Sequence, residues 1–145
     1  MKDVLDTELQ LFLRSILPDE DEVQTELRDY ADALCGPVTH FIDFREGGVE
    51  GVRMLRDVSD KAVILGRPIS PEFDPNEVDG ILDVADGLGI SSISDMPLRN
   101  IEALADAAHR KGKIFAIHAS ERIREDIDSV LSLEPDFIVH MCEST

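Results

Sequence analysis

Two histidines end two short apolar runs in the carboxyl-terminal part of the sequence. Residues 113–118 read Lys-Ile-Phe-Ala-Ile-His, and residues 136–140 read Asp-Phe-Ile-Val-His. A run of four or five apolar residues between polar ones is typical of a buried strand in a parallel sheet. If residues 120–134 form the helix that joins the two strands, His118 and His140 lie at equivalent carboxyl ends of neighbouring strands. That is the edge where α/β folds place ligands and catalytic groups.

These residue types favour metal chemistry. Two imidazoles at one edge could share a divalent ion, or one could bind the ion while the other holds its water. Glu121 follows His118 by three residues, where the strand gives way to the expected helix, and is close enough to act as a proton shuttle. A histidine at a strand end can equally be a hydrogen-bonded surface residue, so the pattern alone leaves both interpretations open.

The elements that position these residues repeat regularly along the chain. Strands are expected to begin near residues 38, 62, 88, 113 and 136, a period of roughly 24 residues that fits a strand, a turn, a helix and a turn. Two amphipathic helices are expected before them, so that residues 1–36 form a helical lead-in and residues 37–145 form five βα-type units of a single domain. Repeated βα units form either an open sheet or part of a (β/α)₈ barrel, and the period does not choose between them.

Four further polar residues stand at expected strand ends or turns. Arg45 and Glu46 precede two glycines that allow a tight turn, and Arg67 and Asp95 follow the second and third expected strands. All four are weak candidates for substrate contacts. For Arg67 and Asp95 a loop-stabilising salt bridge is the preferred interpretation.

The two remaining histidines are not expected to bind metal. His40 falls inside the first expected strand, residues 38–44, and is interpreted as a packed core or helix-facing residue. His109 falls in the last turn of the helix that begins at Pro97, where a cationic side chain suits the helix dipole, so a surface position is expected.

Composition limits the classes of partner. The formal charge of the 145 residues is −17, which argues against nucleic acid and anionic membranes. Arginine outnumbers lysine ten to four, and the spread of acids is typical of proteins from salt-loving microbes. We expect a cytoplasmic protein, because no apolar stretch reaches membrane-spanning length and the acidic amino terminus does not fit a signal peptide.

Four segments together resemble the amidohydrolase superfamily, and within it the cytosine deaminase and chlorohydrolase-like enzymes. They are Phe-Ile-Asp-Phe-Arg-Glu-Gly-Gly-Val-Glu-Gly-Val at 41–52, Ile-Leu-Gly-Arg-Pro at 64–68, His-Ala-Ser-Glu at 118–121 and Phe-Ile-Val-His-Met at 137–141. The resemblance covers most of the chain from about Val38. Its most specific element is His-x-x-Glu at one strand end with a histidine at the next.

The resemblance implies a metal-dependent hydrolase of C–N bonds on a (β/α)₈ barrel, with the strands here matching about barrel strands two to six. His118 would be a ligand of a divalent metal, zinc or iron. Glu121 would carry protons between the metal-activated water and the leaving nitrogen. His140 would orient that water or bind a second metal, and the substrate would be a small molecule.

The sequence departs from the family pattern at two of the expected sets of metal ligands. The family's His-x-His pair on the first barrel strand does not occur in this sequence, and its final Asp ligand would lie beyond Thr145. We therefore expect a truncated or split member that is inactive alone and needs a complementary chain or a homo-oligomer. Two alternatives stay open, namely a non-catalytic remnant or interaction module, and an unrelated open five-stranded domain of receiver-like shape.

Overall fold

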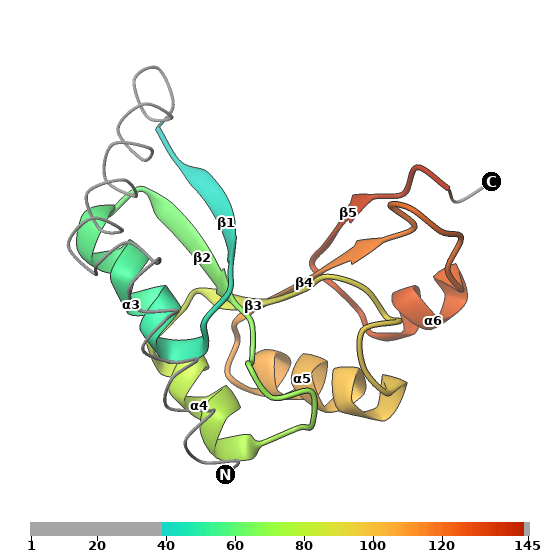
Figure 1. Cartoon of the computed structure of the whole chain (residues 1–145), viewed down its shortest axis with the longest axis horizontal. Helices are drawn as coiled ribbons and strands as arrows, with labels where there is room; N and C mark the ends of the chain where they lie inside the picture. Colours follow the sequence, from blue (N-terminus) through green and yellow to red (C-terminus); the bar gives the residue numbers. More distant parts are fainter. Residues whose placement is uncertain (1–38, 144–145) are drawn as a thin grey trace, which may run out of the picture.

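The computed structural model describes residues 39–143, and the expected lead-in helices over residues 1–36 lie outside this range. Strands and helices alternate along the described chain (Figure 1). In order they are β1 (Phe41–Arg45), α3 (Gly48–Val58), β2 (Ala62–Gly66), α4 (Pro75–Val84), β3 (Gly87–Ile90), α5 (Leu98–Arg110), β4 (Ile114–Ala119), α6 (Ile127–Ser132) and β5 (Phe137–His140).

The five strands form one parallel sheet in the order β1-β2-β3-β4-β5. Figure 1 shows this sheet curled into a half-barrel, with the helices along its outer side. A doubly wound sheet, such as the receiver type, reverses its strand order at a switch point. The sequential order here has no such point, so the receiver-like alternative does not describe this sheet.

The main core lies between the outer face of the sheet and the helices. In β4, Phe115 and Ile117 are fully buried and belong to this core, together with Ile81 of α4 and Ile101 of α5. Gly66 shows how closely the two layers approach, because a Cβ at this position would lie 2.4 Å from Cγ2 of Ile81. The alternation of side chains along β4 then directs His118, between Ile117 and Ala119, towards the opposite, inner face.

The inner face is filled by side chains from strands that are not neighbours. Phe44 of β1 packs edge-on against the ring of His118, with ring centroids 4.3 Å apart, and against Phe137 at 6.3 Å. Gly89 of β3 makes room for this crossing, since a Cβ there would lie 2.4 Å from Cδ1 of Phe44. The curl of the sheet and the absence of a side chain at Gly89 together bring β1 against β4.

Two aspartates make the same pair of hydrogen bonds at the amino ends of β3 and β5. The carboxylate of Asp86 accepts from the backbone N–H of Ile64 at 2.8 Å, and the N–H of Asp86 donates to the Ile64 carbonyl at 2.9 Å. Asp136 makes the same pair of bonds with Phe115, both at 2.8 Å. Each aspartate lies immediately before its strand and extends the parallel pairing by one step.

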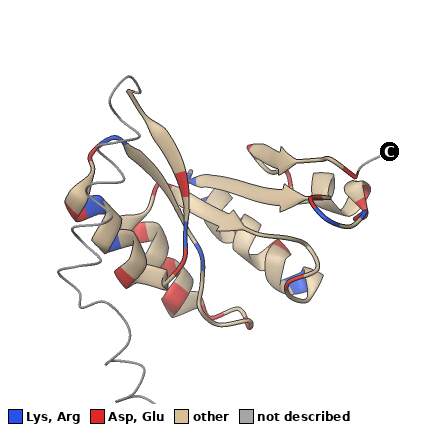
Figure 2. Ribbon diagram, turned by 45° about the horizontal axis from the view of Figure 1, so that its top comes forward, with Lys and Arg blue, Asp and Glu red and all other residues tan. Residues whose placement is uncertain are grey.

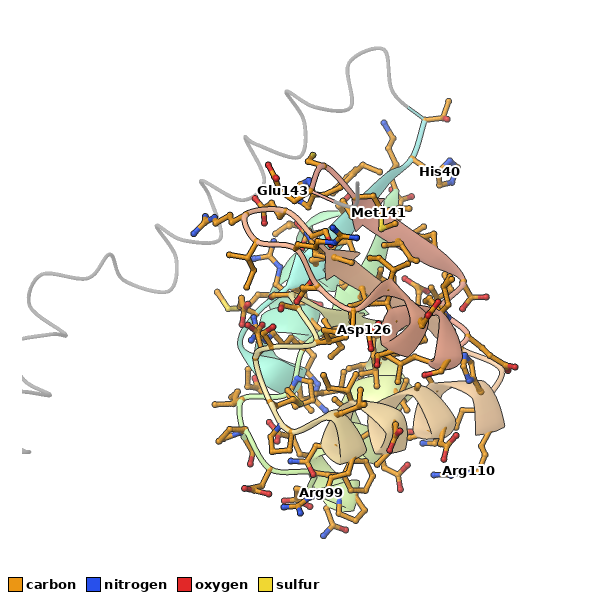
Figure 3. The ribbon with its side chains drawn as sticks, turned by 90° about the vertical axis from the view of Figure 1, so that its right-hand side faces the viewer. His40, Arg99, Arg110, Asp126, Met141 and Glu143 are labelled. Atoms are coloured by element: carbon orange, nitrogen blue, oxygen red, sulfur yellow. The ribbon has the colours of Figure 1, made fainter. Side chains whose placement is uncertain are left out.

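The structure corrects two expectations from the sequence. His40 is exposed and precedes β1, so it is not a packed residue within a strand (Figure 3). The helix expected over residues 120–134 is confined to Ile127–Ser132, and residues 120–126 form a loop. His109 is exposed, as predicted.

The described residues include no helix with the length and hydropathy that crossing a membrane requires. Figure 2 shows acidic residues on the helices of the outer face as well as in the loops.

Candidate metal centre

His118 is the last but one residue of β4 and is partly buried. Burial lowers the pKa of its imidazole below the ordinary value, and the neighbouring His140 lowers it further, while Glu121 opposes the shift. The neutral form is therefore favoured, which is the form that binds a metal ion. The edge-on contact with Phe44 restricts the orientation of the His118 ring.

His140 is the last residue of β5 and does not lie directly opposite His118. In the register His118 pairs with Val139, and His140 pairs with Ala119. An offset of one residue places side chains on opposite faces of a regular sheet. At this point, however, the strand leaves the extended conformation, because φ is 76° at His140 and 65° at Met141. The His140 ring lies with its centroid 4.9 Å from that of His118.

Glu121 comes from the loop that follows β4. Its carboxylate lies 3.7 Å from Nε2 of His140, and the side chain is about half exposed. The preceding residue, Ser120, also has a positive φ, of 51°. Non-glycine residues in this conformation are uncommon and are found preferentially at functional sites, so their presence at both strand ends supports a site at this edge.

The three side chains fit a divalent metal ion. His118, Glu121 and His140 each offer one ligand atom, and these atoms all lie within 4.8 Å of one another. Ligand atoms about 2.1 Å from a tetrahedral ion are separated by about 3.4 Å, so small side-chain rotations would complete the geometry. Two histidines and one carboxylate are a known ligand set for catalytic zinc and for non-haem iron(II). The predicted site residues thus meet in space.

A buried carboxylate anchors the loop that carries Glu121. Glu125 is only 9% exposed and accepts hydrogen bonds from the hydroxyls of Ser92 and Ser94 and from the backbone N–H of Ser120. Its own N–H donates to Oγ of Ser120 at 3.2 Å. Burial would raise the pKa of Glu125, but these hydrogen bonds outweigh it and hold the pKa below the ordinary value.

A pocket of about 430 Å³ adjoins this loop. Glu121 and Glu125 lie on its wall, together with serines of the loop after β3. Glu121 therefore faces both the two histidines and a space that could hold a small molecule. The volume lies within the range of small-molecule sites.

Arg67 joins the loops after β1, β2 and β3. Its guanidinium forms ion pairs with Glu46 at 2.9 Å and with Asp95 at 3.0 Å. The salt-bridge interpretation of Arg67 and Asp95 thus agrees with the geometry, and both lie beside a second pocket, of about 420 Å³. Arg45 pairs with Asp43 at 2.9 Å and does not line either of these two pockets.

Sequence reasoning did not identify Glu125 or Phe44 as part of the site. Glu125 falls within residues 120–134, the segment expected to be helical, and belongs to no motif there. Phe44 looked like any apolar residue of a buried strand. The contact of Phe44 with His118 depends on the curl of the sheet, for which a single strand gives no signal.

The chain is similar to three archaeal proteins. A protein of Archaeoglobus fulgidus with the name "Putative aminohydrolase" is 41% identical over 120 residues, which cover 83% of this chain and 33% of that protein. A protein of the same name from Methanothermobacter thermautotrophicus is 32% identical over 101 residues, 62% of this chain and 26% of its own length. An uncharacterized protein of Methanocaldococcus jannaschii is 35% identical over 128 residues, 71% of this chain and 33% of its own length.

The chain therefore spans a third or less of the length of these relatives. No family model and no solved structure matches the chain.

Proposed function

We propose that this chain carries part of the active site of a metal-dependent aminohydrolase that hydrolyses a C–N bond in a small molecule. The observation that carries the proposal is the meeting of His118, Glu121 and His140 at the carboxyl ends of neighbouring parallel strands. The names of two relatives support the reaction class. The sequential sheet order supports placing the five strands in a (β/α)₈ barrel of the amidohydrolase superfamily, in its deaminase-like branch.

Each residue has a role that follows from its position. His118, neutral and restrained by Phe44, and His140 would hold the ion through ring nitrogens, with the Glu121 carboxylate as the third side chain within reach of it. A zinc or iron ion bound here would supply Lewis acidity and lower the pKa of a water molecule towards about 7. Glu121 lies between the histidines and the pocket, so its carboxylate can accept a proton at the ion and donate it to a leaving nitrogen.

The complete site would need further ligands and strands. Because the relatives are about three times as long as the matched region, we propose that a further segment, a complementary chain or a second copy supplies them. The lack of nucleic-acid and membrane partners and a cytoplasmic location stay predictions from composition. The same is true of a high-salt habitat.

A second candidate function is a non-catalytic interaction module. It is favoured by Ile42, which is 52% exposed on β1, an edge strand of the sheet formed by the described residues 39–143. An exposed apolar residue on an unpaired strand edge is a common contact for another chain. Metal affinity separates the two functions, since an interaction module has no need of a specific ion.

The test is a zinc titration of the purified chain at high ionic strength, measured by calorimetry. A second titration with cobalt(II) reports the coordination of the ion through its visible spectrum. We expect about one ion per chain. Loss of an outer-shell partner typically weakens metal binding by roughly 10- to 100-fold. Because His118 and His140 would contact the ion directly, His118→Ala and His140→Ala should each weaken zinc binding by at least that factor.

His40→Ala is the matched control, because His40 is exposed just before the amino end of β1, whereas His118 and His140 lie at the carboxyl ends of their strands. It should bind zinc like the unmodified chain. Equal binding by all three variants, or no binding by the unmodified chain, would reject the metal site.

A further inference from the structure

Glu125 is the one charged side chain that is buried among the described residues 39–143, where Asn100 and Ser120 are the other buried polar residues. It is not among the three residues that could hold a metal, and the proposed reaction gives it no chemical role. A buried charge is costly unless it is satisfied by hydrogen bonds. Its presence beside the candidate site therefore calls for a function.

The hydrogen bonds of Glu125 join two loops at the carboxyl edge of the sheet. Ser92 and Ser94 belong to the loop after β3, and their hydroxyls donate to one carboxylate oxygen, Oε1, that of Ser94 at 3.1 Å. The other oxygen, Oε2, accepts the Ser120 N–H at 2.8 Å at the end of β4. No ion pair of Glu125 with a described lysine, arginine or histidine accompanies these bonds. The carboxylate is thus held by uncharged donors alone.

Ser120 and Glu125 also close the intervening loop on itself. Their two reciprocal bonds, Ser120 N–H to the carboxylate and Glu125 N–H to Ser120 Oγ, span five residues. Glu121 is the first residue inside this closed loop. Ser120 adopts a φ of 51°, which is unfavourable for serine and persists only where surrounding contacts hold it.

We infer that Glu125 is a positioning residue for Glu121. By tying the loop after β4 to the loop after β3, Glu125 sets the direction in which the chain leaves β4 and so holds the Glu121 carboxylate beside His140. This inference rests on the proposed function, because it assigns Glu125 to the same metal-binding site. Glu125 itself is not one of the three side chains that could hold the ion.

A carboxylate suits this position better than its isosteres. It offers only acceptors, and all three partner groups donate to it. A glutamine would turn an NH₂ group towards at least one donor, and an alanine would leave the buried Ser120 N–H without an acceptor. The conservative variant is therefore expected to show a partial effect and the alanine variant a full one.

The experiment is a double-mutant cycle read by zinc affinity. Glu125→Ala should weaken zinc binding by about 10- to 100-fold, the usual effect of losing an outer-shell partner, and Glu125→Gln should weaken it less. In a Glu121→Ala background the same Glu125→Ala change should have little further effect, because its influence passes through Glu121. Equal effects in both backgrounds would show a general structural role and overturn the inference.

Glu77→Ala is the matched control. Glu77 also anchors a loop, since its carboxylate accepts the N–H groups of Ile69 at 2.7 Å and Ser70 at 3.3 Å, but that loop follows β2. The variant should leave zinc affinity unchanged. The double variant Ser92→Ala, Ser94→Ala disturbs the same anchor in a second way, because it removes two hydrogen-bond donors and keeps Glu125. It should also weaken zinc binding.

Limited trypsin digestion of the metal-free chain tests the anchor without any ion. Glu125→Ala should speed cleavage after Arg122, inside the anchored loop, relative to cleavage after the exposed Arg110 at the end of α5 (Figure 3). Unchanged relative cleavage would overturn the inference. If the unmodified chain binds no zinc, the proposed function fails, and the positioning role of Glu125 fails with it even where cleavage changes.

Discussion

At the amino ends of β3 and β5, Asp86 and Asp136 each complete a backbone pair with the preceding strand, in nearly identical geometry. At the carboxyl ends of β4 and β5, Glu121 lies half exposed beside two histidines, and Ser120, His140 and Met141 have positive φ. Acidic residues thus extend the regular strand pairing at the amino edge, whereas at the carboxyl edge an acidic residue lies beside backbone with positive φ. The comparison leads us to expect that changes at the amino edge act mainly on stability and changes at the carboxyl edge mainly on the candidate site.

The two glycines of β3 give the largest expected difference between the edges. A Cβ at Gly87 would lie 2.1 Å from the backbone carbonyl oxygen of Ile114, whereas a Cβ at Gly89 would mainly meet the ring of Phe44. Backbone cannot move aside as a ring can, so Gly87→Ala should cost about 3 kcal/mol or more and Gly89→Ala about 1 to 2 kcal/mol. Urea unfolding measures both. A larger loss for Gly89→Ala would contradict the ranking.

Removal of an amino-edge aspartate should lower stability and leave the metal site intact. Asp86→Ala leaves the N–H of the buried Ile64 without its acceptor, at a cost of about 1 to 3 kcal/mol. The ion pair of Asp86 with Arg56 is too exposed to add much. Asp136→Ala should behave alike through Phe115. Urea unfolding and zinc titration should be run on the same samples. A large change in zinc affinity would contradict the expectation that the amino edge does not affect the metal site.

The sequence predicted the strands, and the positions of His118 and His140 at neighbouring strand ends, better than the loops between them. The apolar runs before His118 and His140 predicted β4 and β5 to within one residue. Burial explains the continuous apolar signal of β4, whereas β5 carries the same signal although it is only partly buried. The curl of the sheet could not be read in this way. The approach of Phe44 to His118 depends on β1 and β4 together, and neither strand alone carries a signal for it.

The loop after β4 shows why the remaining part of the site was missed. Residues 120–134 have an acceptable helical pattern, yet Ser120 turns to φ 51° and Glu125 points into the protein to bind two loops. No local rule predicts a positive φ at serine. The one-residue offset between His118 and His140 was also hidden, since register depends on the pairing of two strands.

Acid should weaken the carboxyl edge before the amino edge. The pKa of Asp86 is lowered because hydrogen bonds from Ile64 and Arg56 and the nearby positive charges outweigh burial; hydrogen bonds from serines lower that of Glu125 in the same way. A carboxyl whose folded pKa is lowered stabilises the fold above its unfolded pKa, and this stability is lost as the pH falls through the folded pKa.

The ordinary pKa values are 4.5 for Glu125 and 3.8 for Asp86, so the loss from Glu125 should begin at the higher pH. Urea midpoints between pH 7 and pH 3 should fall less steeply for Glu125→Gln and for Asp86→Asn than for the unmodified chain. Identical slopes in all three proteins would show that neither carboxyl governs acid sensitivity.

Relief of backbone strain should give the smallest effect, and one that differs between the two edges. Glu134, before β5, has a φ of 50° and an exposed side chain. Glu134→Gly removes a conformational cost of about 1 to 2 kcal/mol and adds an unfolded-state entropy cost of about 0.5 to 1 kcal/mol, so stability should rise by up to about 1.5 kcal/mol.

Ser120→Gly at the carboxyl edge relieves the same strain but loses the Oγ that accepts the N–H of Glu125, a bond of about 0.5 to 1.5 kcal/mol. Its stability should therefore stay close to that of the unmodified chain. Thermal unfolding of the two variants measures the difference. If Ser120→Gly stabilised the chain as much as Glu134→Gly, the Ser120 hydroxyl would contribute nothing, and the strain at the carboxyl edge would be no more tied to the site than the strain before β5.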